Sequence, residues 1–162
     1  MKNQMKALVR SISMEQWCAL AKTGAAPAVT TTLYGDSMRP LIRREKDEVT
    51  IQPLCRKLKR GDLVLFRSGY GRYVVHRVWK LREQQIQTLG DNCWEPDPWI
   101  PYDQVLGLVV CMKRNKRVVQ LDHVVARSAG RVWMALRPLR NRFRNGKSRV
   151  GRVLRKIGLL RR

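Results

Sequence analysis

At 162 residues the chain can form one compact domain with a buried core, but it is too short for two ordinary domains with linkers. Its 34 lysine and arginine residues against 12 acidic ones give a formal net charge of +22, which favours polyanionic partners. Two histidines and four dispersed cysteines without a Cys-x-x-Cys pair argue against a structural zinc site. We therefore expect no metal or other cofactor, and we assign no cysteine to chemistry.

The first 24 residues predict a helical segment rather than an export signal. Met5 to Ile12 keeps helical spacing, but charged residues interrupt the apolar ones, so a continuous apolar centre is lacking. Ser13 and Gln16 have the spacing of a capping box, and Gly24 is a suitable helix end. No part of the chain has the ~18 consecutive apolar residues that a spanning helix needs. We expect a cytoplasmic or peripheral membrane location.

Residues 25–122 predict a mainly β body. Short runs of β-branched and alternating residues are separated by turn-forming Gly, Asp, Asn and Pro. The predicted strands are Val29–Leu33, Glu48–Gln52, Asp62–Phe66, Tyr73–Trp79, Gln85–Leu89, Val105–Met112 and Arg117–Leu121. We expect these seven strands to form one folded unit between two helical ends.

Residues 123–162 form a basic tail with thirteen lysines and arginines and no acidic residue. Their pattern is helical, with one apolar stripe at Val132, Leu136, Leu139 and Phe143 and another at Val150, Val153, Leu154 and Ile157. An apolar stripe backed by arginines is typical of a helix in a membrane interface. A helix packed on the β body with its basic face in water has the same pattern. The tail is either a contact element for anionic lipid or nucleic acid, or a solvated extension.

Ser37 follows the first predicted strand, in a tight turn that begins with Gly35. A serine needs an adjacent base to become a nucleophile, and His76 is the one histidine of the β body. On its predicted strand His76 shares a face with Val74 and Val78, where apolar surroundings favour the neutral imidazole. Considered alone, the segment fits a core or surface histidine better than a catalytic base.

Two aspartates in the turn that follows the next predicted strand are candidates to orient the imidazole. These are Asp91, within Gly-Asp-Asn, and Asp97, within Pro-Asp-Pro. A buried carboxylate beside a catalytic histidine holds the ring in the required tautomer. Each aspartate is equally suited to forming a turn through its own backbone.

Five segments together resemble the signal peptidase I superfamily, over roughly residues 30 to 113. In order they are Gly-Asp-Ser-Met-Arg-Pro at 35–40, Lys-Arg-Gly-Asp-Leu-Val-Leu-Phe at 59–66, Val-Val-His-Arg-Val at 74–78, Leu-Gly-Asp-Asn at 89–92 with Asp97 six residues after Asp91, and Val-Leu-Gly-Leu-Val at 105–109. Matching order and spacing make the set far more specific than any single residue. With a histidine at position 76, the chain resembles the endoplasmic-reticulum and archaeal signal peptidases, which use a histidine base. Bacterial leader peptidases and LexA-like self-cleaving repressors carry lysine at the corresponding position.

The resemblance implies a coiled, mainly antiparallel β domain that binds its substrate as an added strand. It implies that Ser37 is the nucleophile, His76 the base and Asp97 the residue that orients His76, while Asp91 holds the site together; the two aspartates could exchange roles. The Ser37 N–H would donate to the oxyanion. The sequence departs from the signal peptidases in two ways, because Gly-Asp before Ser37 is closer to the repressor branch and no segment predicts the usual membrane anchor.

These features predict an N-terminal helical segment at 1–24, a serine peptidase β domain at 25–122 and a basic amphipathic helical tail at 123–162. The predicted activity is cleavage of a precursor protein or peptide, at an anionic membrane surface reached by the basic tail. The alternative is an inactive LexA-like β module that binds nucleic acid or a protein partner, although no helix-turn-helix precedes the β body. Self-cleavage is a further alternative, with small residues available at Ala19, Ala21 and Ala25-Ala26.

Overall fold

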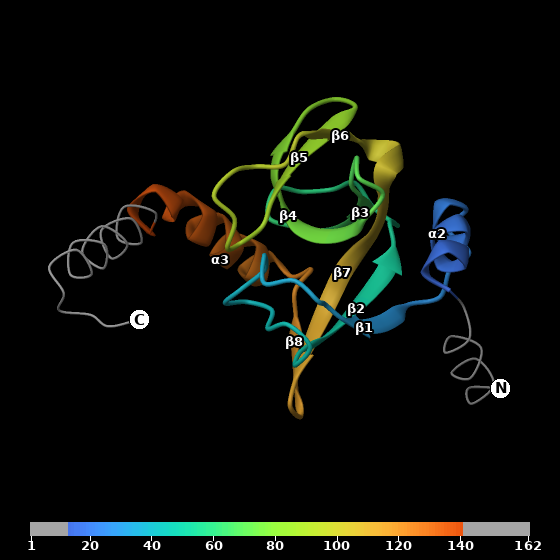
Figure 1. Ribbon diagram of the computed structural model, residues 1–162, viewed down its shortest axis with the longest axis horizontal. Coiled ribbons are helices and arrows are strands. Elements are labelled where there is room, and N and C mark those ends of the chain that lie inside the picture. The colour runs from blue at the N-terminus through green and yellow to red at the C-terminus, as the bar shows by residue number, and fades with distance from the viewer. Residues whose placement is uncertain (1–12, 141–162) are drawn as a thin grey trace, which may run out of the picture.

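The computed structural model describes residues 13–140, which form an eight-stranded antiparallel sheet with a short helix before it and a helix after it (Figure 1). The elements are α2 (Met14–Lys22), β1 (Val29–Thr32), β2 (Glu48–Pro53), β3 (Leu63–Arg67), β4 (Tyr73–Leu81), β5 (Gln85–Leu89), β6 (Trp99–Pro101), the 3-10 turn η1 (Tyr102–Gln104), β7 (Val105–Arg114), β8 (Arg117–Gln120) and α3 (Val124–Ala135). The prediction of a mainly β body is confirmed. The helical spacing predicted at Met5 to Ile12, and the apolar stripes beyond residue 140, lie outside the described residues.

The sheet runs in the order β1-β2-β7-β3-β4-β5-β6, and β8 pairs with the far end of β7. All the pairings are antiparallel. The register shifts at Thr50/Ile51, Leu65/Phe66 and Val78/Lys80. Such irregularities bend strands and increase their twist, and the ribbon curls strongly through β3, β4 and β5 (Figure 1). This curl leaves each of the central strands with two buried faces.

An eighth strand, β6, was absent from the sequence prediction. Trp99–Pro101 pairs with β5, so that Ile100 lies opposite Ile86 and is buried. The Pro96-Asp97-Pro98 segment before it indicated only a turn, because proline removes backbone donors and favours edge positions. A three-residue edge strand carries no alternating pattern long enough to be detected. The seven predicted strands are present, with small shifts at their ends.

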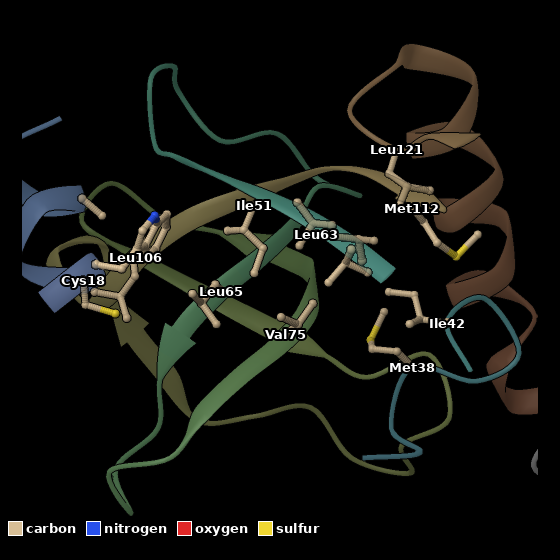
Figure 2. Close-up of a cluster of buried hydrophobic side chains, with 14 of the residues drawn as sticks. Cys18, Met38, Ile42, Ile51, Leu63, Leu65, Val75, Leu106, Met112 and Leu121 are labelled. Carbon is tan, nitrogen blue, oxygen red and sulfur yellow. The ribbon is translucent and has the colours of Figure 1, made fainter. Parts of the chain in front are cut away.

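Alternation along the central strands divides the core into two clusters. Leu63 and Leu65 of β3 lie in the cluster shown in Figure 2, which also contains residues from α2, β4 and the 38–42 segment. Val64 and Phe66 point the other way and pack with Val78 of β4. Helix α2 closes the first cluster through buried Trp17, whose Nε1 donates to the Pro27 carbonyl oxygen at 2.7 Å.

The predicted capping box at the start of α2 is present. The Gln16 N–H donates to Ser13 Oγ at 3.2 Å, and the Ser13 N–H donates to Gln16 Oε1 at 2.9 Å. These two bonds satisfy backbone donors that the first helical turn leaves unpaired. The helix therefore begins at Met14, as its sequence signal indicates.

The segment after Ser37 is attached firmly to the sheet. Met38 and Ile42 are each 1% exposed and lie in the core of Figure 2. Asp47 is fully buried and pairs with Arg43 at 2.9 Å and with Arg114 of β7 at 2.7 Å. Burial alone would raise the pKa of Asp47, but the hydrogen bonds from both arginines hold it well below its usual range. The segment that follows Ser37 is thus fixed to the core and to β7.

Helix α3 packs on the sheet through a different face from its apolar stripe. Gly130 and Met134 are buried, whereas the stripe members Val132, Leu136 and Leu139 are 59%, 45% and 53% exposed. The chain is helical again at 137–140. Within residues 13–140, the structure contains no helix that is both long and apolar enough to span a membrane. Helix α3 therefore packs on the β body through the face that carries Gly130 and Met134, and the apolar stripe remains exposed.

Candidate active site

Strand β4 carries His76 into a buried position, where the imidazole meets Asp97. The His76 Nδ1 and Asp97 Oδ2 atoms are 2.7 Å apart. The histidine side chain is 8% exposed and the Asp97 carboxylate 25% exposed. The Phe66 ring stands edge-on to the imidazole, with ring centroids 6.1 Å apart. Asp97 and Phe66 thereby hold the imidazole ring. Because Nδ1 bonds Asp97, Nε2 is the ring nitrogen that remains for proton transfer.

Asp97 is itself fixed by β5. Its N–H donates to the Thr88 carbonyl oxygen at 2.8 Å, and Thr88 Oγ1 donates to Asp97 Oδ2 at 2.6 Å. The Gln87 side-chain amide donates to the Asp97 carbonyl oxygen at 3.1 Å. The same carboxylate oxygen therefore bonds both the threonine and the histidine. Supporting hydrogen bonds of this kind orient a functional side chain more precisely than its rotamer preference alone.

Ser37 is held against the turn that follows β5. The Asn92 N–H donates to the Ser37 carbonyl oxygen at 2.7 Å, and the Asn92 side chain donates to the Asp36 carbonyl oxygen at 3.2 Å. Gly90 lies where these segments meet the histidine. A β-carbon there would be 2.9 Å from His76 Nε2 and 2.9 Å from the Ser37 carbonyl oxygen. Nε2 therefore faces the Ser37 segment across a backbone that has no side chain.

Ser37 and His76 lie near one another, but their side chains are not hydrogen-bonded in this structure. Within residues 13–140, no hydrogen bond joins Ser37 Oγ to the imidazole. Catalytic hydrogen bonds in substrate-free enzymes are often long and tighten when substrate binds. The structure thus brings His76 and Asp97 into contact and places Ser37 beside them.

The protonation of His76 differs from the sequence expectation. Burial lowers its pKa, as its valine neighbours suggested, but hydrogen bonds with Asp97 and Cys93 outweigh burial and raise the pKa to about 9. The resting imidazole is therefore cationic at neutral pH. A cationic ring cannot accept a proton, so general-base chemistry at Nε2 requires alkaline pH or proton loss on substrate binding.

Asp91 lies on the other side of β4, away from the imidazole. Its carboxylate forms a two-bond pair with Arg77, with both N–O distances at 2.8 Å. Arg77 also donates to the Gly61 carbonyl oxygen at 2.9 Å, and both side chains are at most 4% exposed. The Asp91 carbonyl oxygen accepts from Trp133 Nε1 at 3.1 Å. Asp91 is placed to hold the turn and α3 together, while Asp97 contacts the histidine.

Three residues around the site were not identified from the sequence. Thr88 holds Asp97, Arg77 pairs with Asp91, and Cys93 lies beside His76 Nε2. An arginine within a valine-rich strand was a signal for a buried ion pair, because a buried charge needs a partner. No comparable signal marked Thr88 or Cys93, since both are common in strands and turns.

No cluster of three or more potential metal ligands occurs within residues 13–140. The arrangement can supply a hydroxyl nucleophile, a carboxylate-oriented imidazole and a free backbone donor, which are the components of acyl transfer. No protein-family model matches this chain. A search of curated proteins likewise finds no match.

Proposed function

We propose that the chain is a serine endopeptidase of the signal-peptidase-like type that cleaves a precursor protein or peptide. The observation that carries the proposal is the 2.7 Å contact between His76 Nδ1 and Asp97, with Nε2 facing the Ser37 segment. A carboxylate on one ring nitrogen and a serine near the other is the arrangement that serine hydrolases share on unrelated folds. The motif order from Gly35 to Val109 supports a coiled signal-peptidase/LexA-like β domain.

In the proposed reaction, Ser37 Oγ attacks the scissile carbonyl carbon and its proton passes to His76 Nε2. The tetrahedral intermediate collapses when the imidazolium gives this proton to the leaving amine, which leaves an acyl-enzyme ester on Ser37. A water molecule then attacks the ester, with His76 again acting as base. The Asp97 carboxylate orients the ring and stabilises the imidazolium.

The Ser37 backbone N–H supports an oxyanion site in this proposal. Among residues 13–140 it has no hydrogen-bond partner, so it is available to a substrate oxygen. Removing one oxyanion donor typically lowers kcat by about 10²- to 10³-fold. The buried Met38 side chain and the Asn92 bond to the Ser37 carbonyl oxygen hold this N–H in position.

We further propose that α3 and the basic tail bring the enzyme to an anionic membrane surface. The exposed stripe of Val132, Leu136 and Leu139 provides apolar contact, and the thirteen basic residues of 123–162 provide attraction to anionic headgroups. The Leu136→Ser/Leu139→Ser variant should bind less to vesicles that contain anionic lipid. Equal binding of native and variant chains to vesicles that contain anionic lipid would contradict this part of the proposal.

The decisive experiment is labelling with a fluorophosphonate or a lactam-type acylating probe, measured by intact mass. We expect native protein to gain one label, and Ser37→Ala and His76→Ala to gain none while keeping the native circular dichroism spectrum. Labelling should accelerate as pH rises towards about 9, because the neutral imidazole is the active form. Labelling that persists in Ser37→Ala would refute the nucleophile assignment.

The same samples test the alternatives. An unchanged 18.9 kDa mass after long incubation excludes self-cleavage. Nucleic-acid binding that falls steeply with added salt, in a protein that takes up no label, would instead favour the inactive binding module.

A further inference from the structure

Cys93 is the second nucleophile beside the imidazole. A β-carbon built on Gly90 would be 2.5 Å from Cys93 Sγ and 2.9 Å from His76 Nε2, so the sulfur and the ring nitrogen border the same small space. The Cys93 N–H donates to the Gly90 carbonyl oxygen at 2.9 Å, which holds the cysteine in this tight turn. The thiol, the imidazole and the Asp97 carboxylate thus form a connected cluster.

The thiol also has access to solvent. Cys93 is partly exposed and lines a cavity of about 480 Å³ that Arg39, Asn92, Trp133 and Arg140 also border. The cavity therefore offers a small molecule a route to the Cys93 side chain.

We propose that Cys93 is a modification site that forms mixed disulfides with low-molecular-weight disulfides. A cysteine attacks as the thiolate, and a positively charged group beside the sulfur, here the His76 imidazolium, assists that attack. Cys18, by contrast, is 7% exposed, and burial raises the pKa of its thiol. Cys55 is exposed and, within residues 13–140, has no hydrogen bond with a histidine, so it is an internal reference.

The proposed step balances without a further reactant. The Cys93 thiolate attacks one sulfur of the small disulfide, forming a new protein S–S bond as the original S–S bond breaks. The leaving thiolate takes a proton from the His76 imidazolium. Cys93 is oxidised to the mixed disulfide, and the leaving half of the reagent is reduced to a thiol.

The modification would place a bulky group where Nε2 faces the Ser37 segment. The modification depends on the His76–Asp97 pair and on the cavity. It does not depend on the proposed peptidase activity. If that activity is present, the mixed disulfide would block it reversibly. Oxidation and reduction of Cys93 would therefore switch the candidate active site between a blocked and an open form.

The test uses the full chain with oxidised glutathione at neutral pH, followed by peptide mapping of all four cysteines over time. We expect Cys93 to react at least about tenfold faster than Cys55. In His76→Gln the Cys93 rate should fall to within about threefold of the Cys55 rate, and in Ser37→Ala it should stay at the native value.

A Cys93 rate no greater than that of Cys55, or one unchanged in His76→Gln, would overturn the proposal. If His76→Gln fails to fold, Asp97→Asn provides the same test, because it keeps the imidazole but removes the group that stabilises its cationic form. A fall in the Cys93 rate in that variant is expected, and an unchanged rate overturns the proposal. Labelling of Ser37 by the acylating probe is measured separately, so failure of the peptidase proposal remains distinguishable.

Discussion

Two neighbouring residues of β4 point to opposite faces of the sheet, and each meets an aspartate from the same turn. On one face His76 bonds Asp97, whose carboxylate is a quarter exposed. On the other face Arg77 bonds Asp91 in a pair that is almost fully buried. Strand alternation separates the two pairs, although both join β4 to the segment between β5 and β6.

The difference between these pairs indicates how one turn can serve both chemistry and structure. The histidine pair has a titratable member and an open ring nitrogen, which are required for proton transfer. In the arginine pair, the Arg77 guanidinium bonds both Asp91 and the Gly61 carbonyl oxygen. Trp133 of α3 then bonds the Asp91 carbonyl oxygen. We infer that Asp91 supports the position in which Asp97 can act.

The largest expected effect is on the histidine side. Asp97→Asn should lower the rate of labelling by the acylating probe about 10³- to 10⁴-fold, because asparagine favours the wrong imidazole tautomer and stabilises the imidazolium poorly. The second-order labelling rate measures this loss. Asp36→Asn is the matched control, since Asp36 is adjacent to Ser37 but exposed, and its rate should change by less than about threefold. A similar loss in both variants would contradict a specific role for Asp97.

Asp91→Asn should affect stability instead. It leaves the buried Arg77 guanidinium without a counter-charge, which typically costs about 3–5 kcal/mol of unfolding free energy. Urea denaturation of this variant and of Asp97→Asn gives the comparison directly. The double variant Arg77→Met/Asp91→Leu should recover much of the loss, because removing both buried charges is often neutral. An Asp91→Asn protein as stable as Asp97→Asn would remove the distinction between the two sides.

The histidine pair should also make stability depend on pH. The pKa of His76 is raised from 6.5 to about 9 in the fold, so its stabilisation is complete below 6.5 and is lost as pH rises through about 9. The difference in unfolding free energy between the native chain and His76→Gln should therefore shrink by about 3 kcal/mol between about pH 6 and pH 10. Denaturation at several pH values measures it. A difference that grows with pH would show that the ring is buried in its neutral form.

Much of this arrangement followed from the sequence because it depends on local patterns. Alternation in Tyr73–Trp79 predicted which residues share a face with His76, and turn residues separated the strands. The strand Trp99–Pro101 was missed because its only evidence is pairing with β5, a contact between distant residues. Short edge strands beside proline have no periodicity to detect.

In the candidate site, too, local motifs predicted some residues, and contacts between distant segments determine the others. The positions of Ser37, His76, Asp91 and Asp97 came from ordered motifs, whereas the partners Thr88, Arg77 and Cys93 depend on how three strands and a turn pack. The valines around His76 indicated a neutral ring, and that expectation is opposite to the raised pKa. A hydrogen bond with a carboxylate 21 residues away outweighs the local apolar environment.

The smallest predicted effect concerns Gly90, which separates Ser37 from the imidazole. In Gly90→Ala the new β-carbon would meet Cys93 Sγ at 2.5 Å and the Ser37 carbonyl oxygen at 2.9 Å. The backbone oxygen cannot move away without disturbing its bond from Asn92, so we expect a loss of about 1–3 kcal/mol in unfolding free energy. Gly69→Ala is the matched control, because a β-carbon there has no neighbour within 4 Å. If both variants lose equal stability, as measured by urea denaturation, then the close approach at Gly90 does not hold the two segments together.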